Sequence, residues 1–212
     1  MKVCHQDSRA QRSVSSFLLV AALCFCACLP FSSLGCGLFE PRTPEPPSQS
    51  SLNFRPPTDP AIVIANLQSA IDQKNVANYV RCFADPATMR RRFVFTPSAE
   101  ANAQYGSAFS NWDVTEEQAY FQNLTARSSP TAFSNLLLTP KSSVVTADSV
   151  IYSYDYIFTF EHSDPGFPKT ARGNLQFSLA TDNSNFWMIY QWSDFKTGED
   201  ITWSMFKGKF SN

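Results

Sequence analysis

An alternation of aromatic and smaller side chains over residues 150–160 is the clearest pattern in this chain. Every second position there is aromatic: Tyr152, Tyr154, Tyr156, Phe158 and Phe160. The positions between them hold Ile151, Ser153, Asp155, Ile157 and Thr159. Successive side chains of a β-strand point to opposite faces of a sheet, so this pattern predicts a strand with one aromatic face. Such a face needs a large apolar partner: helices laid across the sheet, a ligand or another protein.

Further strand patterns, separated by turn signals, fill the same half of the chain. We expect strands at residues 133–139, 171–179 and 186–192, with a piece at 144–146 that continues the first strand or stands alone. Turns are predicted at 163–166 and 182–184. Residues 201–206 are expected to form a last short strand or a helical turn. Neighbouring strands joined by short turns predict a largely antiparallel sheet.

Helical periodicity comes before the strands. Asp59 is a predicted N-cap and Pro60 suits the first helical position. An apolar stripe follows at helical spacing, formed by Val63, Ile64, Leu67, Ala70 and Ile71. The sequence therefore predicts a first helix that packs one face on the core.

Three more helices are expected before the run of strands that starts at residue 133. Asn75 predicts the cap of a second short helix, and Thr96 or Ser98 that of a third, over about residues 97–109. A short strand is expected between these two helices, and Thr115 begins a capping-box pattern for a fourth helix. Helices followed by a run of strands are typical of an α+β domain rather than an alternating α/β domain.

The N-terminal segment has the pattern of an export signal. Basic residues precede an apolar run at 17–31, which at about 15 residues suits a signal peptide and is short for a membrane span of about 20. A permanent transmembrane anchor is the alternative. Cys36 follows small residues and precedes a Pro- and Ser-rich stretch at 38–58, whose composition is typical of an extended tether.

This arrangement resembles the lipobox of bacterial lipoproteins. In that family the peptide is cut before the cysteine, which then carries lipid such as palmitate, so the resemblance implies lipidation of Cys36. The sequence departs from the pattern at Ser33, where the family usually has leucine. An ordinary secretory signal, with Cys36 as a free thiol, is the alternative.

The predicted organisation is therefore a signal peptide at 1–35, a lipidated cysteine with its tether at 36–58, and a single domain at 59–212. Phe54 in the tether is expected to dock on the domain. Most of the six cysteines fall in the signal segment, and Cys82 alone remains in the domain, so no internal disulfide is expected there. Cys82 lies in an apolar helical pattern and is predicted to be a small buried side chain.

Charge and motifs exclude several classes of function. The chain has 17 Lys and Arg against 18 Asp and Glu, so no basic excess favours nucleic acid. No Cys-x-x-Cys, His-x-x-x-His or acidic calcium loop is present, so neither a metal nor a cofactor is expected. His162 is interpreted as a solvated histidine at a strand end. The Arg90–Arg92 run is interpreted as a solvated turn, with an anion or lipid-headgroup site as the alternative.

The order of elements resembles the nuclear transport factor 2-like, cystatin-like fold. The resemblance is carried by the opening helical hairpin, residues 64–86, and by the last strand, Phe186-Trp-Met-Ile-Tyr-Gln-Trp-Ser-Asp194. It implies a cone in which N-terminal helices pack on a curled, mainly antiparallel sheet. That superfamily includes isomerases, dehydratases and polyketide cyclases, and also proteins that have only a pocket or a dimer interface. The fold alone therefore does not identify a function.

Aromatic side chains are the main candidates for a site. Those expected to line an apolar pocket are Tyr152, Tyr154, Tyr156, Phe158, Tyr190 and Trp192; the alternative is that they form the core between sheet and helices. Enzymes of the resembled fold use a pocket acid, for which Asp155, Asp194 and Asp72 are isolated candidates.

The sequence thus favours an envelope lipoprotein, anchored through Cys36, that acts as a binding or assembly module. By resemblance to enteric lipoproteins, Gly37 in place of aspartate implies the outer membrane, facing the periplasm. Expected partners are the membrane, a small apolar ligand or an envelope protein, and a second copy bound through the outer sheet face. The alternative is an isomerase-, dehydratase- or cyclase-like enzyme with an acidic residue in an apolar cone pocket.

Overall fold

A computed structural model of the chain describes residues 53–211. The predicted signal peptide, Cys36 and most of the predicted tether lie outside the described residues. The described residues belong to one compact unit, Pro47–Asn212, and their side chains form an apolar core. A unit with its own core can in principle fold on its own. No helix in the described part is long and apolar enough to cross a membrane.

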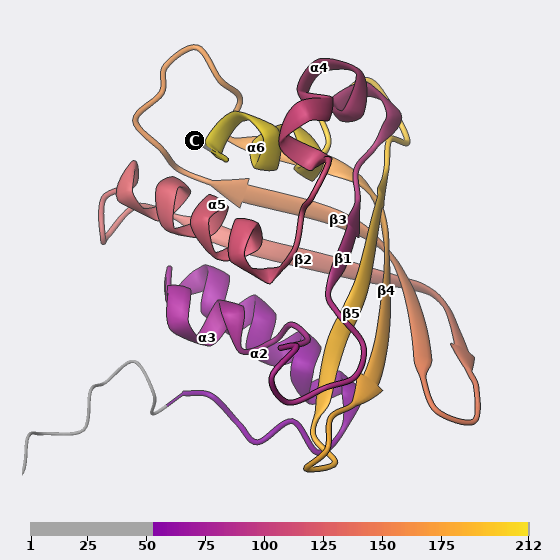
Figure 1. The fold of residues 1–212 in the computed structure, drawn as a ribbon. Helices are drawn as coiled ribbons and strands as arrows, with labels where there is room; N and C mark the ends of the chain where they lie inside the picture. The colour runs from indigo at the N-terminus through magenta and orange to yellow at the C-terminus, as the bar shows by residue number, and fades with distance from the viewer. Residues whose placement is uncertain (1–52, 212) are drawn as a thin grey trace, which may run out of the picture. The chain divides into compact units, whose positions relative to one another are not determined.

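The fold is α+β, and its strands form a five-stranded sheet in the order β1-β5-β4-β3-β2 (Figure 1). The strands are β1 Val94–Thr96, β2 Ser134–Val145, β3 Val150–Phe160, β4 Thr170–Thr181 and β5 Trp187–Phe195. β1 runs parallel to β5, and all other neighbours are antiparallel. The aromatic strand predicted at residues 150–160 is confirmed as β3.

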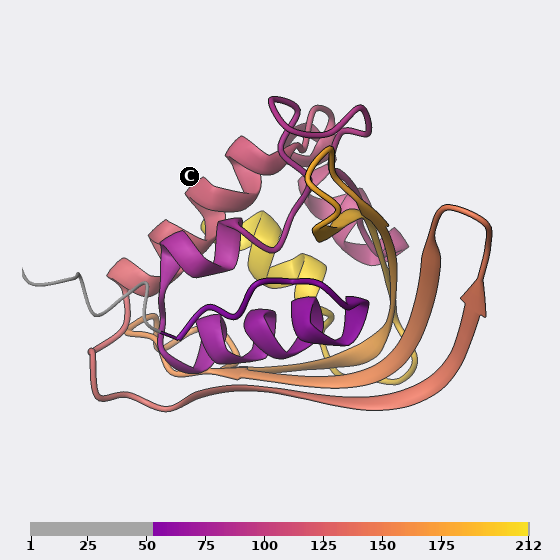
Figure 2. The same cartoon turned by 90° about the horizontal axis from the view of Figure 1, so that it is seen from below.

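The helices lie on the concave side of the curled sheet, as the view in Figure 2 shows. They are α2 Pro60–Asp72, α3 Val76–Val80, α4 Ala99–Phe109, α5 Val114–Ala126 and α6 Trp203–Phe210. Asp59, Asn75 and Ser98 cap the first three of these through their side chains, as the sequence predicted. The predicted class, helices packed on a curled, mainly antiparallel sheet, is confirmed.

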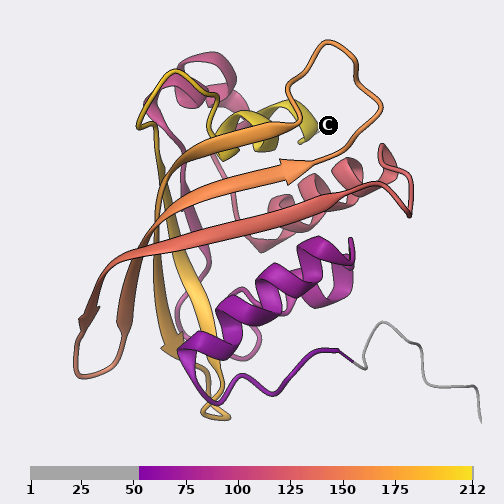
Figure 3. The ribbon, with the colours of Figure 1, turned by 180° about the vertical axis from the view of Figure 1, so that it is seen from behind.

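The β2–β3 hairpin bends away from the rest of the sheet (Figures 2 and 3). β2 is one continuous strand, with a register shift between Pro140 and Ser142, so the piece at 144–146 continues the first predicted strand. A bulge of this kind bends a strand and increases its twist. Closer to the helices, Gln68 of α2 donates to the Leu136 carbonyl at 3.0 Å and holds that helix beside the edge strand.

Two local expectations were wrong, and a third had been left open between two alternatives. The cap of α5 is Asp113, which forms a capping box with Glu116, so this box begins two residues before Thr115. The tail, expected as a short strand or a helical turn, is helix α6, so the helical alternative is the correct one. His162 is not solvated: it is 5% exposed, its ring packs on Phe206 and Phe210, and its Nε2 lies 3.2 Å from the Pro168 carbonyl.

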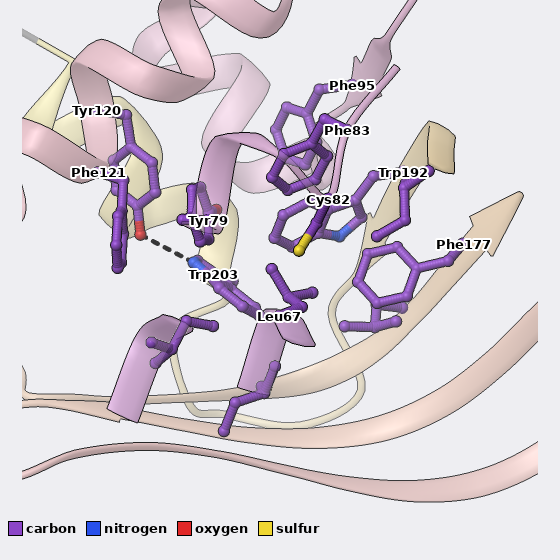
Figure 4. Packing of buried hydrophobic residues seen from close by; sticks show 14 of the residues in the cluster. Leu67, Tyr79, Cys82, Phe83, Phe95, Tyr120, Phe121, Phe177, Trp192 and Trp203 are labelled. Atoms are coloured by element: carbon purple, nitrogen blue, oxygen red, sulfur yellow. Dashed lines mark hydrogen bonds between the residues drawn. The ribbon is translucent and has the colours of Figure 1, made fainter. Parts of the chain in front are cut away.

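The space between helices and sheet is filled with aromatic side chains (Figure 4). Trp203 is fully buried, stacks on Phe158 with 4.2 Å between ring centroids, and donates from Nε1 to the Tyr120 hydroxyl at 2.8 Å. Trp192 meets Trp203 edge to face at 4.6 Å. Aromatic pairs in these geometries contribute about 0.5–1.5 kcal/mol each beyond their buried area. The buried aromatic side chains of β3 therefore pack against the helices, chiefly α6.

Gly208 lets α6 approach α4 closely. A Cβ at this position would lie less than 3.0 Å from Cβ, Cγ and Cδ2 of Tyr105, whose backbone interrupts α4 with non-helical angles (φ −126°, ψ 26°). Atoms so close to the backbone of Tyr105 cannot move aside without shifting the helix.

Gly208→Ala is therefore expected to destabilise the domain by about 1–3 kcal/mol, although glycine to alanine inside a helix ordinarily stabilises by about 1 kcal/mol. In a Tyr105→Ala background the loss should shrink, because Cγ and Cδ2 of Tyr105 are gone and only its Cβ remains within 3.0 Å. Urea unfolding of the four proteins in this double-mutant cycle measures both effects. Stabilisation by Gly208→Ala alone would contradict the close contact.

Candidate functional site

A buried ion pair between α5 and α6 occupies the centre of the domain. Lys207 Nζ pairs with both carboxylate oxygens of Glu117, and both side chains are 0% exposed. Glu117 also accepts from the Tyr79 hydroxyl at 2.5 Å and from Trp112 Nε1 at 2.7 Å. Burial of the charged form lowers the pKa of Lys207 to about 8, although Glu117 opposes that change.

Aromatic rings enclose this ammonium group. Lys207 Nζ lies 3.5 Å from the ring centroid of Trp192 and 4.1 Å from that of Phe95. These rings attract a cation through their negative faces, and they also separate the pair from water. Every oxygen of Glu117 is engaged by a protein donor, so the pair holds the helices together and offers no group to a substrate.

Asp194 forms the centre of a second buried network, where β5 ends against the N-terminus of α6. Its Oδ1 accepts from the Tyr156 hydroxyl at 2.8 Å, and its Oδ2 accepts from the backbone N–H of Ser204 at 2.7 Å and from the Ser204 hydroxyl. The Tyr156 hydroxyl accepts in turn from the backbone N–H of Trp203 at 2.7 Å. Thr202, the N-cap residue of α6, makes no side-chain capping bond, so Asp194 satisfies the first turn of the helix in its place.

Burial shifts the pKa values of several titratable groups in the interior of the domain. Burial raises the pKa of the Asp194 carboxyl above its ordinary value, even though Ser204 and Tyr156 favour the charged form. Burial likewise raises the pKa of the hydroxyls of Tyr79, Tyr120 and Tyr156 well above 10. The Cys82 thiol is buried and its pKa is raised by the same cause, which confirms its interpretation as a small buried side chain.

The structure does not bring the six predicted pocket residues together. Phe158 and Trp192 are fully buried in the core, and Tyr156 serves the Asp194 network. Tyr190 is half-buried under Arg91, whose guanidinium carbon lies 4.6 Å from the ring centroid. Tyr152 and Tyr154 meet edge to face at 5.9 Å and border a shallow hollow beside Ala61 and residues 140–143.

The other candidate residues are also separated. Asp155 lies on the outer face of β3 and pairs with Lys141 at 3.1 Å. Asp72 is exposed at the end of α2. Of the three arginines at 90–92, Arg91 pairs with Asp148, while Arg90 and Arg92 are exposed. Within residues 53–211, no cluster of histidine, cysteine or acidic side chains has the geometry of a metal site.

A cavity of about 460 Å³ lies outside this closed interior, between segments that are distant in the sequence. Its walls come from residues 54–57, the end of α3, the loop at 85–88, the first turns of α5 and the start of β5. The apolar wall includes Val80, Phe83, Phe186 and Met188, and the polar groups are Arg81, Asp85, Thr88, Thr115 and Gln118. A volume of 300–1,000 Å³ and a largely apolar lining with a few polar groups are typical of small-molecule sites.

Residues 53–58 form one wall of this cavity, and we call them the N-terminal strap. Asn66, a buried side chain of α2, binds both backbone groups of Arg55: its Oδ1 accepts from the N–H at 3.1 Å and its Nδ2 donates to the carbonyl at 2.8 Å. The Pro57 carbonyl accepts from the Trp187 N–H at 2.8 Å. Phe54 packs on the domain beneath Arg81, which confirms the expectation that it docks.

Sequence reasoning missed this cavity and the Glu117–Lys207 pair. Glu117 stands in a run of helix-initiating polar residues, and Lys207 lies in the tail, 90 positions away. The one available signal for the cavity was a phenylalanine in an otherwise proline- and serine-rich stretch.

Comparison with known proteins finds likeness in solved structures alone. No family model matches the chain and no curated protein is similar to it. An NTF2-like superfamily protein from Salmonella enterica is 13% identical with a TM-score of 0.48, over 65% of this chain and 87% of that one. A ketosteroid isomerase-like protein from Erwinia carotovora is 11% identical with a TM-score of 0.47, over 66% and 94%.

An NTF2-like protein with a cystatin-like fold from Novosphingobium aromaticivorans is 9% identical with a TM-score of 0.47, over 65% of this chain and 79% of that one. These neighbours carry the fold names that the sequence resemblance had suggested. At such identities the likeness concerns the arrangement of helices and strands, and it assigns no activity.

Proposed function

We propose that this protein is a lipid-anchored envelope protein whose domain binds a small apolar ligand in the cavity beside the N-terminal strap. The cavity carries the proposal, because its volume of about 460 Å³ and its largely apolar lining suit such a ligand. The anchor rests on the export signal and on Cys36, which would place the domain on the periplasmic side of the outer membrane, at the end of a proline-rich tether.

Binding suits the cavity better than catalysis. Asp85 is the one carboxylate in its described lining. It is exposed, and its Oδ1 already accepts from the Ala87 N–H at 2.8 Å. The buried acids, Glu117 and Asp194, lie outside this cavity and are engaged by protein donors, although Asp194 also borders a separate open hollow beside the start of α4. An acid or base positioned for proton transfer must reach the substrate, and the described lining of this cavity contains no buried carboxylate.

Two measurements test the two halves of this proposal. The mature protein is expected to fractionate with membranes, and Cys36→Ala should abolish covalent lipid, which mass spectrometry of the intact chain detects. Native mass spectrometry of protein taken from its own envelope should show an extra mass that disappears on denaturation. Lipid still attached in the Cys36→Ala protein would refute the anchor. An unliganded mass, together with no binding of any apolar probe, would refute the binding function.

A further inference from the structure

We propose that the cavity selects an amphipathic organic anion: a compact apolar body that carries one carboxylate, bound by Arg81. This inference rests on the binding function proposed above and names the chemical class of its ligand. It follows from the position of Arg81, from the pairing of the charges around it and from the way the strap is held.

Arg81 supplies a cation at the cavity wall, at the end of α3. Its guanidinium carbon lies 3.9 Å from the ring centroid of Phe54. A guanidinium that stacks on a ring in this way keeps its N–H donors available at its edges, where they match the two oxygens of a carboxylate. Among the described residues no carboxylate forms an ion pair with Arg81, and of the arginines without such a pair it is the one that lines the cavity.

Phe54 fixes the position of this cation. The ring belongs to the N-terminal strap, whose backbone Asn66 grips from both sides at Arg55. Arg81 therefore rests on a support that is held before any ligand arrives. Preorganisation of this kind lowers the entropy lost when a binding group is immobilised.

The remaining wall favours an apolar body next to that charge. Phe186, which is 36% exposed, and Met188 line the cavity, so water bound against this apolar surface is displaced favourably by an apolar ligand. Asp85 also borders the cavity, four residues after Arg81. Its negative charge repels an anion, which places the ligand carboxylate on the Arg81 side and makes Asp85 an opposing control.

Isothermal titration calorimetry with matched ligand pairs tests this inference on residues 47–212, the compact unit that contains the core described above. The pairs are decanoate with 1-decanol, and 2-naphthoate with 2-naphthalenemethanol, at pH 7.5. Each carboxylate should bind about tenfold more tightly than its alcohol, a factor typical of one charge-assisted contact. A preference confined to the decanoate pair identifies a lipid-derived acid, and one confined to the naphthoate pair identifies an aromatic acid.

Variants separate the charge from the cavity. Arg81→Gln should weaken carboxylate binding about tenfold and leave alcohol binding unchanged, while Asp85→Asn should strengthen carboxylate binding by a factor of about two to five. Arg90→Gln, an exposed arginine outside the cavity lining, is the control and should change neither. If alcohols and carboxylates bind equally, the anion inference fails and the binding function stands. If no ligand binds, the binding function itself fails.

Discussion

Replacing Glu117 with alanine is expected to lower the free energy of unfolding by about 3–5 kcal/mol, the range found when one partner of a buried ion pair is removed. Lys207 would then lie fully buried without a carboxylate, and the Tyr79 hydroxyl and the Trp112 indole N–H would lose their acceptor. An unsatisfied buried donor costs about 1–3 kcal/mol. Urea denaturation followed by tryptophan fluorescence measures the change.

The double variant Glu117→Gln/Lys207→Met is the matched control. It removes both charges, keeps an oxygen for Tyr79 or Trp112, and fills the aromatic enclosure of Lys207 with an apolar chain. Removing both charges avoids the cost of an unpaired buried ion, and one donor at most loses its acceptor, so the double variant should lose only about 1–3 kcal/mol and remain more stable than Glu117→Ala. If the double variant is as unstable as Glu117→Ala, the pair is not the origin of the loss.

The same pair gives a distinct pH dependence. The pKa of Lys207 is lowered to about 8 in the folded protein, whereas an unfolded lysine titrates near about 10.4. Between these values the unfolded chain binds more protons than the folded one, so the stability contributed through Lys207 rises with pH by up to about 1.4 kcal/mol per unit. The wild type should therefore gain stability relative to the double variant from pH 8 to 9.5.

Local sequence patterns were sufficient for most of the secondary structure. The alternation over 150–160 predicted β3 correctly, because one face of this strand is buried against the helices. Asp59, Asn75 and Ser98 marked helix starts, because their short polar side chains accept from the first free N–H groups of a helix. These signals are contained within a few neighbouring residues, so they can be read without knowing the fold.

For α6 the local pattern left a short strand and a helical turn as alternatives and could not decide between them. This helix is buried on nearly every side, including Ser204, Lys207 and Gly208, so it lacks the polar face that marks a surface helix. Its capping acceptor, Asp194, comes from another strand. His162 was misjudged for the same reason: its neighbours in sequence are a glutamate and a turn, but its neighbours in space are the aromatic rings of α6.

The candidate site depends even more on long-range packing. Its walls unite the N-terminal strap, α3, α5 and β5, and no local pattern shows that these segments meet. Of the six aromatic residues predicted to line a pocket, Tyr156, Phe158 and Trp192 instead fill the core. Because the core is tightly filled, the cavity of the proposed ligand lies at the periphery, between the N-terminal strap and the helices.

Replacing Asp194 with alanine is expected to cost more than about 3 kcal/mol, because three buried donors lose their acceptor at once. These donors are the Tyr156 hydroxyl and the N–H and hydroxyl of Ser204. The loss would loosen the first turn of α6 and, with it, the stacking of Trp203 on Phe158. Thermal unfolding, together with the near-ultraviolet circular dichroism of the buried tryptophans, reports both effects.

Asp194→Asn separates hydrogen bonding from charge. The amide keeps an acceptor for Ser204 but loses the one for Tyr156, so a smaller loss, of about 1–2 kcal/mol, is expected near neutral pH. Because burial raises the pKa of Asp194, the folded wild type holds a proton at pH values where the unfolded chain has released it. The advantage of the wild type over Asp194→Asn should therefore shrink as pH rises from about 4, by at most about 1.4 kcal/mol per unit. An advantage that grows with pH would show instead that Ser204 and the helix N-terminus outweigh burial, and that Asp194 anchors α6 as a charge.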